Sequence, residues 1–182
     1  MEGWELFRIK GIPLRIHPSW FFILILFAWT AHEQISNAIE YTVPFWLSWT
    51  LGLITSLLLF VSVLLHELGH SFMALHEGVK VRSITLFLLG GVARVEKECS
   101  TPMGSLRVAI AGPLVSLLLS IIFLRSVQSA NELSPLLANL LGQLGSLNLV
   151  LALFNLLPGL PLDGGVILKA LVWQFTGSQR KG

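Results

Sequence analysis

Two histidines and a glutamate stand at a spacing that suits metal chemistry, in the run His66-Glu67-Leu68-Gly69-His70. Residues four positions apart lie on one face of an α-helix, so the two imidazoles can bind one zinc ion. The glutamate beside the first histidine can then hydrogen-bond a water at the metal and take its proton. We therefore predict His66 and His70 as zinc ligands and Glu67 as the general base.

The segment before this motif strengthens the prediction. Residues 45–65 are apolar and contain no charged side chain, and this run is long enough to cross a membrane as a helix. Ionisable side chains at membrane depth are costly and are functional candidates for that reason. The alternative is that His66, Glu67 and His70 lie at the lipid headgroups as an ordinary helix end.

A third ligand is needed, because a catalytic zinc ordinarily takes three protein ligands and leaves one position open. Besides Glu67, the acidic residue in or directly beside an apolar segment is Asp163, which lies in a segment rich in proline and glycine. If four spans cross the membrane, the ends of the second and fourth lie on the same side. Asp163 is therefore the predicted third ligand, and the alternative is a helix N-cap.

Composition places the chain in a membrane. Of its 182 residues, 54% are hydrophobic and 12% charged, whereas soluble domains carry about 25% charged residues. The formal net charge is only +2 and no long basic run occurs, which argues against nucleic-acid binding. The single cysteine, Cys99, excludes an intramolecular disulfide.

The predicted fold is an all-α polytopic membrane protein with at least four transmembrane helices and a small β element on the cytoplasmic side. Residues 1–182 would form a single transmembrane domain. Alternation from Val81 to Phe87, the pair Gly90-Gly91 and a second run from Val92 predict strand, glycine turn and strand. The predicted spans are 18–31, 45–75, 106–124 (interrupted at Gly112-Pro113) and 135–157, with the β element at 80–97.

Charge asymmetry predicts the orientation of these spans. If the four spans cross in turn, eleven lysines and arginines fall on one side of the membrane and only Arg125 on the other. Positive residues favour the cytoplasmic side. We therefore expect the N-terminus and the metal site on the cytoplasmic side, in a multi-pass protein of the lipid bilayer.

The motif at 66–70 and the element Leu162-Asp163-Gly164 resemble the site-2 protease family of intramembrane zinc metalloproteases. Further stretches resemble the family across nearly the whole chain: His17-Pro18-Ser19-Trp20, Gly90-Gly91-Val92-Ala93, Ala111-Gly112-Pro113, and Asn148 with Asn155 seven residues later. Val166 departs from the pattern, because the family often carries a basic residue there.

The resemblance implies one zinc per chain, held by His66, His70 and Asp163, with Glu67 activating water. It implies regulated intramembrane proteolysis of a single-span substrate, such as an anti-sigma factor or a membrane-bound transcription regulator. Asn148 or Asn155 would hydrogen-bond the substrate backbone or the oxyanion, or else join two helices. The short segment between the second and third spans leaves no room for a PDZ domain, which points to the group that often carries CBS domains.

Two further expectations concern function. The predicted strands could hold an unwound substrate segment as an added strand. The competing hypothesis is a zinc-binding membrane protein without catalysis, such as a transporter or a scaffold. A transporter would ordinarily carry polar residues along a path through the bilayer, whereas the charged candidates here gather at one depth.

Overall fold

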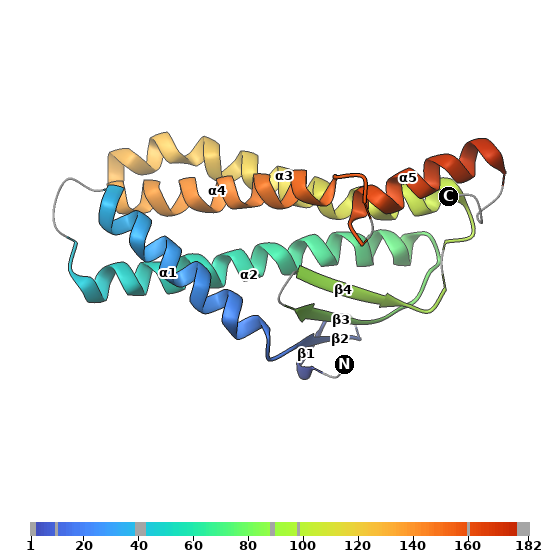
Figure 1. Cartoon of the computed structure of the whole chain (residues 1–182), viewed down its shortest axis with the longest axis horizontal. Helices are drawn as coiled ribbons and strands as arrows, with labels where there is room; N and C mark the ends of the chain where they lie inside the picture. The colour runs from blue at the N-terminus through green and yellow to red at the C-terminus, as the bar shows by residue number, and fades with distance from the viewer. Residues whose placement is uncertain are drawn as a thin grey trace.

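The computed structural model describes residues 3–9, 11–38, 43–87, 90–97, 99–159 and 161–177. Five helices and four strands follow one another along this part of the chain (Figure 1). In chain order they are β1 (Trp4–Ile9), β2 (Ile12–Ile16), α1 (Trp20–Ala38), α2 (Phe45–His76), β3 (Val81–Phe87), β4 (Gly90–Val95), α3 (Pro102–Leu133), α4 (Pro135–Asn155) and α5 (Asp163–Thr176).

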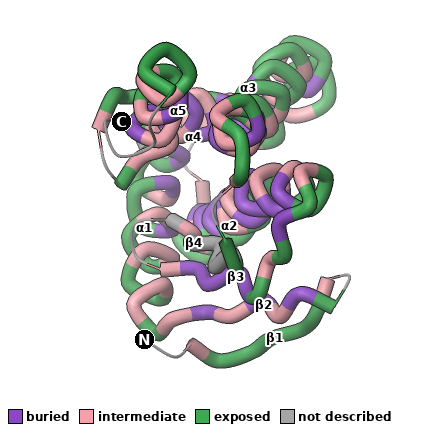
Figure 2. Tube along the Cα trace, turned by 90° about the vertical axis from the view of Figure 1, so that its right-hand side faces the viewer, coloured by how far each residue is buried: buried purple, intermediate pink, exposed green. Residues whose placement is uncertain are grey.

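The long helix α2 is the centre of the arrangement. Helices α3 and α4 run alongside it, α1 crosses it at an angle, and the sheet lies along its C-terminal half (Figure 1). Seen from the end of the bundle, α2 lies between the sheet on one side and the layer of α3, α4 and α5 on the other (Figure 2). The buried side chains in the C-terminal half of α2 therefore contact the sheet or the helical layer.

The strands form one sheet in the order β1-β2-β3-β4. The pairs β1–β2 and β3–β4 are antiparallel, whereas β2 and β3 are parallel with Leu14 opposite Ile84. The predicted β element is therefore present, but the N-terminal hairpin was not predicted. Its signals are the alternation of Ile12, Leu14 and Ile16 and a turn at Gly11, whose φ of 83° suits glycine.

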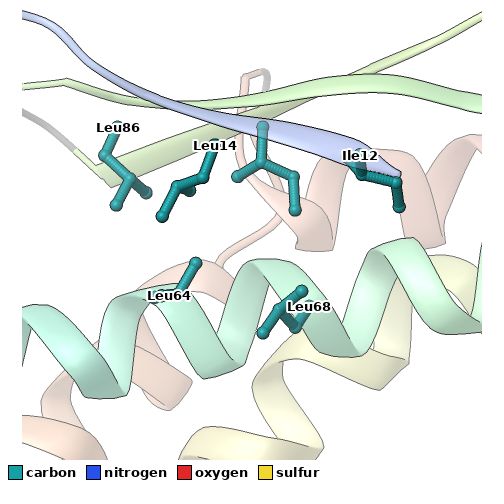
Figure 3. Packing of buried hydrophobic residues seen from close by; sticks show 6 residues of the cluster. Ile12, Leu14, Leu64, Leu68 and Leu86 are labelled. Carbon is teal, nitrogen blue, oxygen red and sulfur yellow. The ribbon is translucent and has the colours of Figure 1, made fainter. Parts of the chain in front are cut away.

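Apolar side chains of the sheet and of α2 form a common core. Figure 3 shows Ile12, Leu14 and Leu86 pointing from the strands toward Leu64 and Leu68 of α2. Burying an aliphatic side chain of this size contributes about 1.5–3 kcal/mol. Positions 64 and 68 are offset by two residues, about 200°, from positions 66 and 70. The same packing that fixes α2 on the sheet therefore turns both histidines toward the helical layer.

Three of the described helices, α2, α3 and α4, are long and apolar enough to cross a membrane. They correspond to the second, third and fourth predicted spans, and α3 extends beyond the predicted 106–124 at both ends. Helix α1 is not among them, because its 19 residues include the polar run His32-Glu33-Gln34. The prediction of at least four spans is thus confirmed for three.

Two local predictions were wrong. The third span is not interrupted, because α3 continues through Pro113, which only removes one backbone donor from the helix. Gly90 and Gly91 do not form the turn, because both lie in β4, where they pair with Phe87 and Leu86. Residues 88–89 lie outside the described part of the chain.

Candidate metal centre

Three predicted ligands meet in one place. His66 and His70 come from α2, and Asp163 comes from the first turn of α5, almost a hundred positions later in the sequence. The Nε2 atoms of the two histidines lie 3.1 Å apart. Asp163 Oδ2 lies 3.3 Å from His66 Nε2 and 3.2 Å from His70 Nε2. These three atoms therefore form a nearly equilateral triangle.

The size of this triangle fits zinc. Bonds of about 2.0–2.2 Å at tetrahedral angles place neighbouring ligand atoms about 3.3–3.6 Å apart. The three donors would need to move apart by only a few tenths of an ångström, roughly, to take up that geometry. Two imidazoles and one carboxylate also match a catalytic zinc site, in which a fourth position stays open. The residues present therefore fit a zinc ion.

Both imidazoles are oriented by contacts of their Nδ1 atoms, on the side of the ring away from the other ligands. His70 Nδ1 lies 2.7 Å from the carbonyl oxygen of Val108, to which it can only donate. His66 Nδ1 lies 2.9 Å from the hydroxyl oxygen of Ser116. Both partners belong to α3. With the proton on Nδ1, each Nε2 presents its lone pair to the metal, as in the outer coordination shells of zinc sites.

The side chain of Asp163 is free of any capping role and points toward the two histidines. The N-cap of α5 is Leu162, and Asp163 is the first helical residue, with no capping hydrogen bond from its side chain. Its Oδ2 is buried and makes no hydrogen bond, which leaves an anionic oxygen aimed at the two Nε2 atoms. Burial alone would raise the pKa of this carboxyl, but close contact with His66 and His70 outweighs burial and holds the pKa below its usual range.

Glu67 lies on the same turn of α2 and is buried, with 7% of its surface exposed. The backbone of Gly91 in β4 lies directly against its carboxylate. A Cβ at position 91 would collide with Glu67 Cγ, Cδ and Oε1, the last at 2.7 Å. The glycine in β4 thus lets the strand backbone lie directly against the predicted base.

A second glycine brings α3 close to the histidines. A Cβ at Gly112 would meet Nε2 of both His70 and His66, the latter at 2.7 Å. On α2, a Cβ at Gly69, the residue before His70, would lie 2.9 Å from the carbonyl oxygen of Ala111 on α3. Small residues permit such close helix contacts in membrane bundles. The approach of α3 is what places the Val108 carbonyl and the Ser116 hydroxyl behind the imidazoles.

The two predicted asparagines occupy different surroundings. Asn148 is fully buried, and its Nδ2 donates to Ser62 Oγ at 3.1 Å on α2 and to Leu144 O at 2.8 Å on its own helix. Both amide hydrogens of Asn148 are thereby used, one of them between helices. Asn155 lies at the C-terminal end of α4, and its Nδ2 donates to Leu151 O at 2.9 Å. One amide hydrogen of Asn155 remains without a partner among the described residues.

Comparison with known proteins identifies the family. Residues 54–136 and 125–181 match peptidase family M50. The chain belongs to peptidase family M50. A relative in Synechocystis is 51% identical over 174 residues, which cover 94% of this chain and 45% of that protein. The zinc metalloprotease of Methanocaldococcus jannaschii is 42% identical over 168 residues, 92% of this chain and 45% of its own length.

A solved structure supports the fold. The site-2 protease from Methanocaldococcus jannaschii superposes with a TM-score of 0.67 at 36% identity, covering 96% of this chain and 73% of the other. The resemblance to site-2 proteases is therefore confirmed, and this M50 chain is an integral membrane protein. It spans a little under half the length of the curated relatives that it matches.

Sequence reasoning missed the residues of the M50 chain that support the ligands. Ser116 and the Val108 carbonyl orient the imidazoles, Gly112 admits α3, and Gly91 admits β4. The signals were present only in part. Gly112 and Gly91 were noted for their resemblance to family motifs, and Ser116 is a hydroxyl inside an apolar helix, but nothing in the sequence pairs them with particular histidines.

Proposed function

We propose that this chain is the membrane core of a zinc-dependent intramembrane endopeptidase, which cuts a peptide bond within or beside a substrate's transmembrane helix. The observation that carries the proposal is the triangle of His66 Nε2, His70 Nε2 and Asp163 Oδ2 beside the buried carboxylate of Glu67. Residues 1–182 would act as one domain, since the sheet, α2 and the helical layer share continuous packing.

His66, His70 and Asp163 would hold the metal in this mechanism. A bound zinc ion supplies Lewis acidity, which polarises the scissile carbonyl and lowers the pKa of an attacking water toward about 7. Glu67 accepts the proton of that water and later returns it to the leaving amine. The backbone of Gly91 lies against the Glu67 carboxylate and keeps it in place during the first step. Exclusion of bulk water by α2, α3 and β4 strengthens these electrostatic interactions.

Of the two asparagines, Asn155 is the better candidate for contact with the substrate. Its remaining amide hydrogen can donate to a backbone carbonyl or to the oxyanion, and it lies a few residues before Asp163 in the chain. For Asn148 the interhelical hydrogen bond to Ser62 supports a packing role.

The proposed substrate is a single-span, membrane-tethered protein, such as an anti-sigma factor or a membrane-bound transcription regulator. A helix hides its backbone in its own hydrogen bonds, so the cleaved segment must unwind. Strand β4 pairs with β3 on one side and has no strand partner on the other among the described residues. Since Gly91 of β4 touches Glu67, a substrate strand added at that edge would lie beside the base.

Synthetic substrates with single N-methylated peptide bonds test the strand addition. Methylation removes a donor, and only alternate residues of an added strand donate to the neighbouring strand. We expect the cleavage rate to decrease when the methylated bond stands at every second position near the scissile bond. An equal decrease at every position would contradict the strand addition.

We propose that α1 crosses the membrane in addition to α2, α3 and α4. The N-terminus and the metal site would then lie on the cytoplasmic side. The 19 residues of α1 measure about 28 Å, close to the roughly 30 Å of a bilayer core. Cys99 precedes α3, and Leu133 ends it with 80% of its surface exposed. In oriented vesicles, an impermeant maleimide should label Cys99 from the cytoplasmic face and a cysteine at Leu133 from the opposite face; the reverse pattern would overturn the orientation.

The deciding experiment compares the parent chain with Glu67→Gln. Protein in liposomes is mixed with a single-span substrate, with and without a zinc chelator, and zinc content is measured in parallel. We expect Glu67→Gln to keep one zinc and to lose at least about a hundredfold in kcat, the typical worth of a general base. A zinc transporter or scaffold would keep its zinc and show no chelator-sensitive cleavage in either form.

A further inference from the structure

A hollow lies in the half of the bundle farther from the metal ligands. It measures about 530 Å³, within the size range of ligand sites, and it opens between α1, α2 and α4. We call it the polar notch, because amides and hydroxyls from all three helices line it together with apolar side chains. Its polar residues include Gln34, Asn139, Gln143, Thr30, Thr55 and Ser146.

The polar notch reaches into the depth of the spans. Thr55 precedes His66 by eleven residues on α2, which corresponds to about 16 Å along the helix. Ser146 is the twelfth residue of α4, about 16 Å from its start. In a bilayer core about 30 Å thick, hydroxyls this far from the helix ends would lie near the middle. Polar groups at such depth serve as hydrogen-bonding partners between membrane helices.

Part of this hydrogen-bonding capacity is unused. Thr55 Oγ donates to Leu51 O, and Gln143 Nε2 donates to Asn139 Oδ1. The side chains of Gln34 and Ser146, by contrast, are exposed and make no hydrogen bond with any described residue. Among the described residues, no acidic or basic side chain lines the polar notch. It therefore suits a neutral group that both donates and accepts, and it lacks the cations that a phospholipid phosphate would require.

The polar notch is continuous with an apolar hollow that leads toward the metal centre. The apolar hollow measures about 250 Å³ and shares Phe27 of α1, Leu59 of α2 and Leu147 of α4 with the polar notch. It extends to Phe87 at the end of β3, and the strand that follows holds Gly91 against Glu67. The two hollows form one groove along α2, between α1 and α4.

We propose that this groove receives the transmembrane helix of the substrate, and that the polar notch selects substrates carrying a neutral hydrogen-bonding residue in that helix. Along α2, the distance from Ser56 to Glu67 is eleven residues, or about 16 Å. A substrate helix lying along α2 spans this distance with a similar number of residues. The selected asparagine, glutamine, serine or threonine therefore lies about ten to twelve residues from the scissile bond.

This inference rests on the proposed protease function, and a positional scan tests it. One asparagine is moved residue by residue through the apolar helix of a single-span substrate, and kcat and KM are measured for each version. We expect KM to be lowest, by about three- to tenfold, with the asparagine ten to twelve residues from the cut, the size of one or two membrane hydrogen bonds. A flat scan would overturn the proposal.

Variants of the chain show whether the polar notch produces that preference. Ser146→Leu and Gln34→Leu fill it with apolar atoms and should flatten the dependence of KM on the position of the asparagine. The matched control is Ser126→Leu, which changes an exposed serine of α3 outside the groove. If Ser126→Leu flattens the scan equally, or Ser146→Leu leaves it intact, the notch does not select the substrate.

Cross-linking separates this proposal from the catalytic one. In a Glu67→Gln chain with Cys99 replaced by serine, Ser146→Cys is oxidised against single cysteines along the substrate helix. We expect a disulfide at the position picked out by the scan and none from Leu118→Cys on the exposed face of α3. Cross-linking without cleavage by the parent chain would refute the protease and keep the groove. Cleavage without this cross-link, or a disulfide only between two copies of the chain, would refute the groove.

Discussion

Because α3 lies close to the two histidines, the single methyl group added in Gly112→Ala should strongly reduce zinc binding and cleavage. The new Cβ would stand 2.7 Å from His66 Nε2 and nearer still to His70 Nε2. Carbon and nitrogen atoms without a hydrogen bond rarely approach within about 3.4 Å, so the imidazoles or α3 must shift by about 0.7 Å or more. That shift moves two donor atoms of a triangle whose sides are 3.1–3.3 Å.

The expected consequence is loss of the metal, not loss of the helix. Alanine favours a helix over glycine by about 1 kcal/mol, so α3 itself should be no less stable. A displacement approaching 1 Å at a catalytic group costs about a hundredfold in rate. We therefore expect Gly112→Ala to bind well below one zinc per chain and to cleave at least about a hundredfold more slowly than the parent.

The assay is zinc content by elemental analysis of purified protein, alongside the cleavage rate and the thermal unfolding temperature. The matched control is Gly142→Ala, which places the same methyl group in α4, where the nearest atom, Val127 Cγ2, lies 3.9 Å away. Gly142→Ala should keep its zinc. A Gly112→Ala protein with full zinc and parental turnover would show that α3 is not held against the two imidazoles, and the geometric reasoning would fail.

Three further substitutions separate the roles around the metal. Gly91→Ala pushes on Glu67 but not on the ligands, so zinc should stay and kcat should fall about a hundredfold; loss of zinc would contradict this division. Ser116→Ala removes the partner of the His66 imidazole and should weaken zinc affinity about 10- to 100-fold in a chelator titration, with an unchanged affinity as the opposing result. Asn148→Ala should lower stability by about 1 kcal/mol with less than a tenfold change in kcat, because both its amide hydrogens are already used; a hundredfold drop in kcat at unchanged stability would instead indicate an oxyanion donor.

Much of the metal centre could be predicted because its signals are local. The spacing of His66 and His70 fixes their common helix face, and the absence of charge over residues 45–65 makes a membrane helix the natural setting. Asp163 followed from topology, since the second and fourth spans end on one side. The structure brings all three donor atoms together as that reasoning required.

The strands and turns were predicted less well, because their signals compete. Arg8, Lys10 and Arg15 indicated a cytoplasmic segment and concealed the hairpin β1–β2, although Ile12, Leu14 and Ile16 alternate as a half-buried strand does. Gly90 and Gly91 suggest a turn by composition. In the structure they belong to β4, where they pair with Phe87 and Leu86, and the absence of a Cβ at Gly91 permits the contact with Glu67.

The sequence by itself predicted the chemistry: two imidazoles and a carboxylate as ligands and a second carboxylate as base, carried by apolar helices. Only the tertiary structure decided how that chemistry is held. The hydrogen bond of His70 to Val108 joins residues 38 positions apart, and that of His66 to Ser116 joins residues 50 apart. Helical periodicity repeats every 3.6 residues and carries no information on which helix lies opposite. That choice depends on side-chain packing, such as the glycine at 112 that lets α3 come close.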